Sequence, residues 1–111
     1  MLKNSASKTV GVIGVLFKLQ AGQLPEIIHV YPNTPAYKAG IKVGDYIVAV
    51  DGVPVMGLER EDIYGSIVGV PDTPVSLSIR RGNSFFAKKM LRMDVTEIPD
   101  YSTRTKYMRE L

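Results

Sequence analysis

The chain has 111 residues, of which 45% are hydrophobic and 23% are charged. This is ordinary globular usage, which excludes a disordered chain and allows one domain. The net charge is +3, with Arg80-Arg81 and Lys88-Lys89 as the only adjacent basic pairs, so we expect no nucleic-acid partner. The absence of cysteine excludes disulfides and thiolate metal sites, and no residue pattern predicts a metal or a cofactor.

The first thirty residues predict a loop and two strands. Residues 1–7 contain no apolar run, and we expect a flexible N-terminus there. The apolar run 10–17 is short and interrupted by glycine, so we expect no membrane insertion. Its glycines predict instead a loop that leads into a strand over 15–19. Turn residues at 21–23 precede a second strand over 26–31.

Helix signals occur twice in the middle of the chain. Thr34 is a capping residue followed by Pro35, and Gly40 lies soon after, which predicts a short helix over 35–39. Two strands are expected on either side of the Asp51-Gly52 turn, over 46–50 and 53–55. Apolar residues at 58, 63, 64, 67 and 68, after which glycine follows, predict a second, longer helix over 58–68.

The last third of the chain predicts two strands and a polar segment. Alternating apolar residues predict a strand over 75–80, which turns at 81–83 into another over 85–93. Residues 96–111 are polar and show no strand pattern. This polar tail is compatible with a linker, a docked segment or a terminal helix.

The order of these elements resembles that of PDZ domains. Residues 34–52 (TPAYKAGIKVGDYIVAVDG) and 69–82 (GVPDTPVSLSIRRG) look most like PDZ domains of bacterial carboxyl-terminal processing proteases. The resemblance covers about 8–93 and implies a PDZ domain over 8–95. The implied fold is α+β and mostly β, a partly open barrel or sandwich of five to six strands with one short and one longer helix.

The family resemblance also implies a loop that holds a carboxylate. The loop has the form Gly-Φ-Gly-Φ, where Φ is apolar, and the matching residues here are Val12-Ile13-Gly14-Val15, with Lys8 preceding them. Val12 replaces the first glycine, and Gly11 beside it leaves a frame shifted by one residue open. The backbone N–H groups after Val12 are the expected donors, and Lys8 would add a positive charge.

The implied function is the capture of a free, apolar C-terminus of a partner protein by β-strand addition. The ligand would lie between strand 15–19 and helix 58–68, where Tyr64 and Val68 are the preferred wall residues and Ile63 and Ile67 face the core. We expect ligands that end in Val, Leu, Ile, Ala or Phe. The expected peptide-binding residues are Lys8, Val12, Ile13, Gly14, Val15, Leu16, Phe17, Tyr64, Ile67 and Val68.

No residue is expected to be catalytic. The single histidine, His29, is mid-strand and is interpreted as a surface residue. Ser84 and Lys88 lie along a predicted strand without the setting of an activated nucleophile. In the processing proteases that this sequence resembles, the catalytic serine and lysine lie outside the PDZ domain. One alternative is therefore a substrate-recognition or regulatory domain cut from a larger serine protease.

Another alternative is a structural or oligomerisation domain with a closed groove, favoured by Val12 in the loop and by Gly65 in the helix. The chain ends in Leu111, an apolar carboxyl terminus of the expected ligand type, so self-association through Leu111 is a further hypothesis. The location stays open: cytoplasmic if the chain is complete, and the cell envelope if it is excised from a processing protease.

Overall fold

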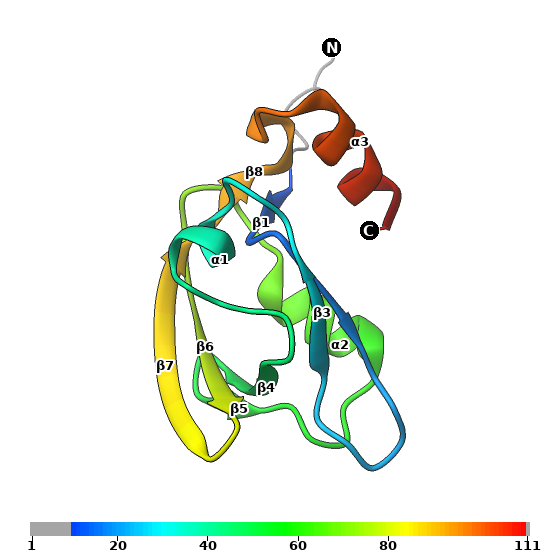
Figure 1. Cartoon of the computed structure of the whole chain (residues 1–111), viewed down its shortest axis with the longest axis vertical. Helices are drawn as coiled ribbons and strands as arrows, with labels where there is room; N and C mark the ends of the chain where they lie inside the picture. The colour runs from blue at the N-terminus through cyan, green and yellow to red at the C-terminus, as the bar shows by residue number, and fades with distance from the viewer. Residues whose placement is uncertain (1–9, 111) are drawn as a thin grey trace.

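The computed structural model describes residues 10–110, and in this range it shows an open antiparallel sheet with helices at its edges (Figure 1). The six-stranded sheet has the order β2-β3-β4-β6-β7 with β5 paired to β4, and β1 and β8 form a separate small sheet. The predicted mostly-β fold is confirmed. The elements are β1 (Gly11–Val12), β2 (Val15–Lys18), β3 (Glu26–Val30), α1 (Pro35–Lys38), β4 (Tyr46–Val50), β5 (Val53–Pro54), α2 (Arg60–Ile67), β6 (Pro74–Arg81), β7 (Ser84–Leu91), β8 (Met93–Asp94), the 3-10 helix η2 (Val95–Glu97) and α3 (Tyr101–Glu110).

The element boundaries follow from local chemistry. Helix α1 begins after Thr34, whose side chain accepts a hydrogen bond from the Tyr37 N–H, and Pro35 occupies the first turn. Helix α2 begins at Arg60, two residues later than predicted, because Glu59 is in the extended conformation. The strand predicted over 85–93 is interrupted at Arg92, whose guanidinium Nε donates to the Ile67 carbonyl at 2.8 Å.

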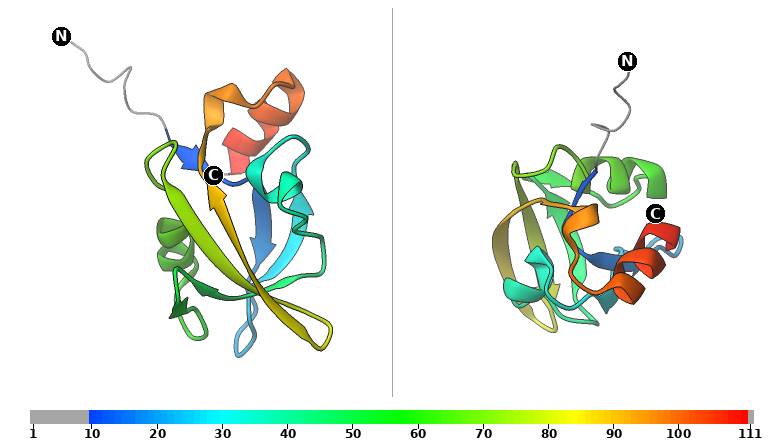
Figure 2. Two further views of the ribbon diagram at one scale, coloured as in Figure 1. Left: turned by 90° about the vertical axis from the view of Figure 1, so that its left-hand side faces the viewer. Right: turned by 90° about the horizontal axis from the view of Figure 1, so that it is seen from above.

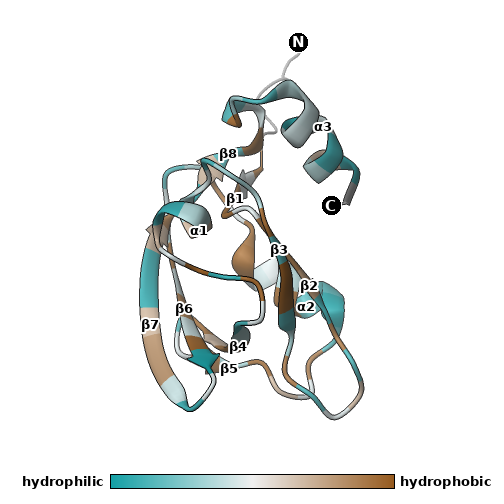
Figure 3. Cartoon of the chain, in the orientation of Figure 1, coloured by the Kyte–Doolittle hydropathy of each residue, from teal (hydrophilic) through white to brown (hydrophobic). Residues whose placement is uncertain are grey.

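A large apolar cluster, here called the main core, lies between the sheet, α1 and α2. Burial of these aliphatic and aromatic side chains is the main driving force for folding. Figure 3 shows brown, apolar segments along the strands that enclose it. Its buried members are Ile13, Val15, Phe17, Ile27, Ala36, Ile41, Ile47, Val50, Val55, Ile63, Ile67, Val75, Leu77, Ile79 and Met90.

A second, smaller apolar group lies where β1, β8 and the C-terminal segment meet. We call it the end cluster, and its buried members are Val12, Tyr31, Val95, Ile98 and Tyr107. Of the arrangements left open for 96–111, the structure shows a 3-10 turn and then a docked helix, α3. Figure 2 shows α3 across the end of the sheet, close to the start of β2 and the end of β3.

One ion pair ties the sheet to the turn before β4. Arg81 donates from Nε and Nη2 to the two carboxylate oxygens of Asp45, each at 2.8 Å. Asp45 is buried although it is charged, and the Lys42 N–H donates to it as well, at 2.9 Å. Among residues 10–110, no helix combines the length and the apolar character needed to cross a membrane.

Candidate functional site

The loop between β1 and β2 has a conformation that requires glycine at position 14. Gly14 has a φ of +90°, and a Cβ atom there would collide with the side chain of Thr34. Thr34 is fully buried, and its hydroxyl donates to the Tyr31 carbonyl at 2.7 Å. The Ala36 N–H donates to the Ile13 carbonyl at 2.9 Å. The loop is therefore held against α1 in one conformation.

Among residues 10–110, β2 is the first strand in the sheet order, so one of its edges faces α2 rather than another strand. The Tyr31 N–H donates to the Gly14 carbonyl at 2.8 Å, which makes Val15 and Val30 a pair that exchanges no hydrogen bonds. The N–H and C=O of Val15 consequently point away from β3. Phe17 has the same orientation, since its carbonyl accepts a hydrogen bond from α2.

Helix α2 packs beside this edge of β2 through Arg60 and Tyr64. The Tyr64 ring stacks on the Phe17 ring with centroids 4.5 Å apart. The Arg60 guanidinium lies over both rings, at 4.8 Å from Phe17 and 5.0 Å from Tyr64, and its Nη1 donates to the Phe17 carbonyl at 3.0 Å. Arg60 therefore occupies an acceptor on the free edge of β2.

Tyr107, from α3, occupies the other end of the same edge. Its hydroxyl lies close enough to the backbone N–H groups of Gly14 and Val15 for them to lower the Tyr107 pKa. The residue is 2% exposed, and its ring lies 4.5 Å from that of Tyr31. Burial raises the pKa of Tyr107, with smaller contributions from neighbouring tyrosines, and outweighs the two N–H groups that lower the pKa. The hydroxyl therefore stays protonated.

The structure brings together most of the residues predicted for the site, but it exposes few of their side chains. The side chains of Val12, Ile13, Val15, Phe17 and Ile67 are buried, as is that of Ile63. Leu16, Tyr64 and Val68 are half-buried, with Leu16 and Val68 packed against the end cluster. Lys8 and Leu111 lie outside the described residues. What the loop and β2 offer is therefore mainly backbone.

Two contributors were missing from the predicted site. Arg60 was not among the predicted site residues, and nothing local in the sequence predicts its bond to the Phe17 carbonyl. Tyr107 was placed in the polar tail. The polar helix carries three large hydrophobic side chains, Tyr101, Tyr107 and Met108, and the sequence does not show which of them is buried or where the helix docks.

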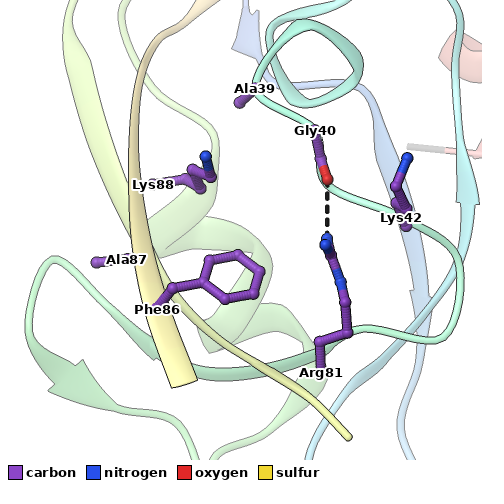
Figure 4. A pocket seen from close by; sticks show the side chains of 7 residues that line it. All are labelled: Ala39, Gly40, Lys42, Arg81, Phe86, Ala87 and Lys88. Carbon is purple, nitrogen blue, oxygen red and sulfur yellow. Dashed lines mark hydrogen bonds between the residues drawn. The ribbon is translucent and has the colours of Figure 1, made fainter. Parts of the chain in front are cut away.

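A second hollow lies on the other side of the molecule, between α1 and the β6–β7 hairpin (Figure 4). It encloses about 400 Å³. Arg81 crosses it and donates to the Gly40 carbonyl at 2.8 Å, with the Phe86 ring 4.8 Å from its guanidinium. The lining is basic, but Asp45 already pairs with Arg81. The residues that line it are Ala39, Gly40, Lys42, Arg81, Phe86, Ala87 and Lys88.

The residues considered for catalysis are dispersed. His29 is exposed on β3 with its ring 4.3 Å from Tyr31, and Ser84 and Lys88 lie at different points of β7. Within residues 10–110, no three His, Cys, Asp or Glu side chains gather as metal ligands would.

An open antiparallel sheet with a glycine loop and a helix beside its free edge strand defines a class of β-rich binding modules. Comparison with known families shows which family of this class the chain matches. A PDZ-domain model matches residues 26–81. The chain belongs to the PDZ domain family, as its sequence predicts.

Relatives of this chain include processing proteases. It is 28% identical over 80 residues to a carboxy-terminal-processing protease of Bartonella bacilliformis, which covers 72% of this chain and 18% of that protein. It is also similar to the photosystem II D1 C-terminal processing protease, with a TM-score of 0.73 and 26% identity over 78% of this chain and 24% of the other.

A PDZ domain from the carboxy-terminal protease of Vibrio cholerae has a TM-score of 0.65 and 21% identity, covering 77% of this chain and 94% of that one. At this identity the likeness shows the fold. The chain thus spans less than a fifth of the Bartonella protease but nearly the whole of the isolated Vibrio domain.

Proposed function

We propose that this domain captures a free, apolar C-terminus of a partner protein by adding it as a strand to β2, in the groove between β2 and α2. The observation that carries the proposal is that the Val15 N–H points away from β3 directly after Gly14, whose φ is +90°. The N–H groups of both residues also lie close to one oxygen atom, the Tyr107 hydroxyl. Consecutive amides aimed at one point form an anion-binding nest. A carboxylate accepts stronger hydrogen bonds from such donors than a neutral hydroxyl does.

The free edge of β2 supplies the rest of the binding energy. Main-chain hydrogen bonds to Val15 and Phe17 would hold a ligand strand largely independently of its sequence. The solved Vibrio relative is described as a complex with a peptide, which supports peptide binding as the use of this fold. The chain itself is proposed to be a recognition module without catalytic residues.

Selectivity for an apolar last residue would come from the apolar surroundings of the loop. Ile13, Val15 and Ile67 are all buried there and carry no polar side-chain atom. A ligand ending in Val, Leu, Ile, Ala or Phe suits these surroundings, whereas an acidic last residue would lose its hydration without a partner. Arg60 at the start of α2 gives no reason to expect Ser or Thr two residues earlier in the ligand.

Two other functions have specific support. A substrate-recognition domain of a larger protease is favoured by the match to 18% of the Bartonella enzyme. A structural domain with a closed groove is favoured by Tyr107 and Arg60, which both occupy the free edge of β2. The first alternative uses the same groove; the second predicts that the groove takes no ligand.

The test is fluorescence anisotropy with a labelled peptide that ends in valine, prepared as the free acid and as the C-terminal amide. We expect the acid to bind with a micromolar dissociation constant, equivalent to about −8 kcal/mol, because a short strand must be ordered on binding. The amide should bind much more weakly. Equal affinities for the acid and the amide would rule out the carboxylate loop.

A further inference from the structure

We infer that α3 is an intramolecular competitor of the peptide: Tyr107 holds the position of the ligand carboxylate, and a peptide binds only when α3 leaves the groove. This inference rests on the proposed function. The inference goes beyond the proposed function because it assigns a regulatory role to α3. It also explains how a closed groove and a binding groove are two states of one molecule.

The first argument is that Tyr107 and a carboxylate need the same donors. Tyr107 packs with Val12 at the start of the loop, and its hydroxyl lies close to the N–H groups of Gly14 and Val15, which are the donors expected to hold the ligand. Each N–H has one hydrogen to donate. With Tyr107 only 2% exposed, its ring also fills the space beside the loop, so the two occupants exclude each other.

The second argument is that α3 is held by few contacts. Of its residues, Tyr107 is the only one with a described side chain that is buried. Figure 3 shows most of the helix in hydrophilic colours. It has 10 residues, three of them Ser or Thr, and an isolated helix of this length is marginal in water. Without its tyrosine contact, α3 therefore has little to keep it folded or docked.

The third argument is that α3 can leave without disturbing the fold. Among the described residues, the main core has no buried member beyond Met90, so the burial that holds the sheet together does not involve α3. The helix is attached to the end cluster through Tyr31, Val95 and Ile98. Asp100 accepts from the Thr103 N–H at 2.8 Å, and Arg104 donates to the Ile98 carbonyl at 3.0 Å; both of these bonds lie within the C-terminal segment itself.

The fourth argument concerns the strength of the two competitors. Tyr107 presents a neutral hydroxyl, whereas a peptide terminus presents a charged carboxylate, which accepts hydrogen bonds roughly twice as strong. A peptide also gains the edge hydrogen bonds of β2 that a side chain from α3 cannot make. At the other end Arg60 must release the Phe17 carbonyl, which requires only a rotation of one long side chain.

The experiment measures peptide affinity for four versions of the chain: wild type, Tyr107→Ala, Tyr107→Phe and Tyr101→Ala. Tyr101 is the matched control, since it is a tyrosine of the same helix that is 71% exposed. Tyr107→Phe removes the hydroxyl while it keeps the ring in the end cluster, so it remains informative if Tyr107→Ala unfolds. Each version is titrated with the valine peptide as the free acid and as the amide.

We expect Tyr107→Ala to bind the acid at least about tenfold more tightly than wild type, because an open state populated at or below about 10% lowers the apparent affinity by that factor. Tyr107→Phe should show a smaller gain, and Tyr101→Ala none. Heteronuclear NMR should show the Gly14 and Val15 amide signals move in Tyr107→Phe without peptide.

The two ways of failing are distinct. If Tyr107→Ala and Tyr107→Phe are folded, prefer the acid over the amide, and bind it no better than wild type does, then the competitor role of α3 is wrong while the proposed function stands. If neither variant distinguishes the acid from the amide, the carboxylate loop itself is wrong. A gain of equal size in Tyr101→Ala would also overturn the inference, since it would show a general effect of loosening the helix.

Discussion

The main core and the end cluster are both apolar and buried, but they hold different things together. The main core has 15 buried members, drawn from residues 13 to 90, and joins the sheet to α1 and α2. The end cluster has five, two of them tyrosines, and joins β1 and the end of β3 to the C-terminal segment. The comparison indicates that the first determines whether the domain folds, and the second determines only whether α3 is docked.

The largest expected effect comes from removing equal side chains from the two clusters. Ile79 and Ile98 are 0% and 1% exposed, so they form a matched pair. Ile79→Ala should lower the free energy of unfolding by about 2–5 kcal/mol, through lost burial and an unfilled cavity. Ile98→Ala should lower it by less, because the C-terminal segment can release. Urea denaturation followed by circular dichroism measures both, and equal losses would contradict the division into two clusters.

Two glycines form a second matched pair, Gly14 in the loop between β1 and β2 and Gly22 in the turn between β2 and β3. Gly14→Ala should lower the free energy of unfolding by roughly 2–4 kcal/mol, since positive φ and overpacking against Thr34 both act against it. Gly22 has a φ of +76° but open space around it, so Gly22→Ala should lose only roughly 1–2 kcal/mol. Thermal and urea unfolding test this. Equal losses would mean that Thr34 gives way and that the loop is not clamped.

The Asp45–Arg81 ion pair should make the stability of the sheet depend on pH. Burial alone would raise the pKa of Asp45, but hydrogen bonds from Arg81 and the Lys42 N–H bring the pKa below its ordinary value. A carboxylate with a lower pKa in the folded state stabilises the fold above its unfolded pKa and loses this contribution as pH falls below about 4.

Asp45→Asn should therefore lower the free energy of unfolding at pH 7 by about 1–3 kcal/mol, because hydrogen bonds to a charged group are lost. At pH 3 its difference from wild type should shrink. Urea unfolding at the two pH values measures this. A difference that stays constant with pH would mean that Asp45 does not titrate with folding.

The smallest effect is expected at the start of α3. The Thr103 hydroxyl and N–H donate to Asp100, and these bonds lower its pKa, as for a helix-capping carboxylate. Asp100→Ala should raise amide hydrogen exchange in α3 several-fold and leave exchange in β4 and β6 unchanged. Faster exchange throughout the sheet would contradict the independence of α3.

Much of the fold follows from local sequence. The capped start at Thr34-Pro35, the turn at Asp51-Gly52 and the alternation over 75–80 each depend on neighbouring residues, and the structure has α1, the β4–β5 turn and β6 at these places. The split between β7 and β8 was missed, because β7 pairs with β6 whereas β8 pairs with β1, a contact between residues far apart in sequence.

The candidate site divides in the same way. Gly14 could be identified for two reasons. The family pattern has a glycine at this position, and the loop needs a residue that tolerates positive φ. The role of Tyr107 could not be identified, since a helix with one buried side chain has no apolar stripe that predicts where it packs. Arg60 belongs to the helix predicted as the wall of the site. Its hydrogen bond to the Phe17 carbonyl could not be predicted, because the pairing of β2 with β3 sets the direction in which that carbonyl points.

The nearly complete burial of Tyr107 also has a consequence for the rate at which a ligand is taken up. A peptide that must wait for the tyrosine to leave cannot associate faster than α3 undocks. In stopped-flow mixing, the observed rate constant would rise with peptide concentration and then level off at the undocking rate, as expected when a conformational change precedes binding. The helix would thus set a maximum speed of capture that no increase in ligand concentration exceeds.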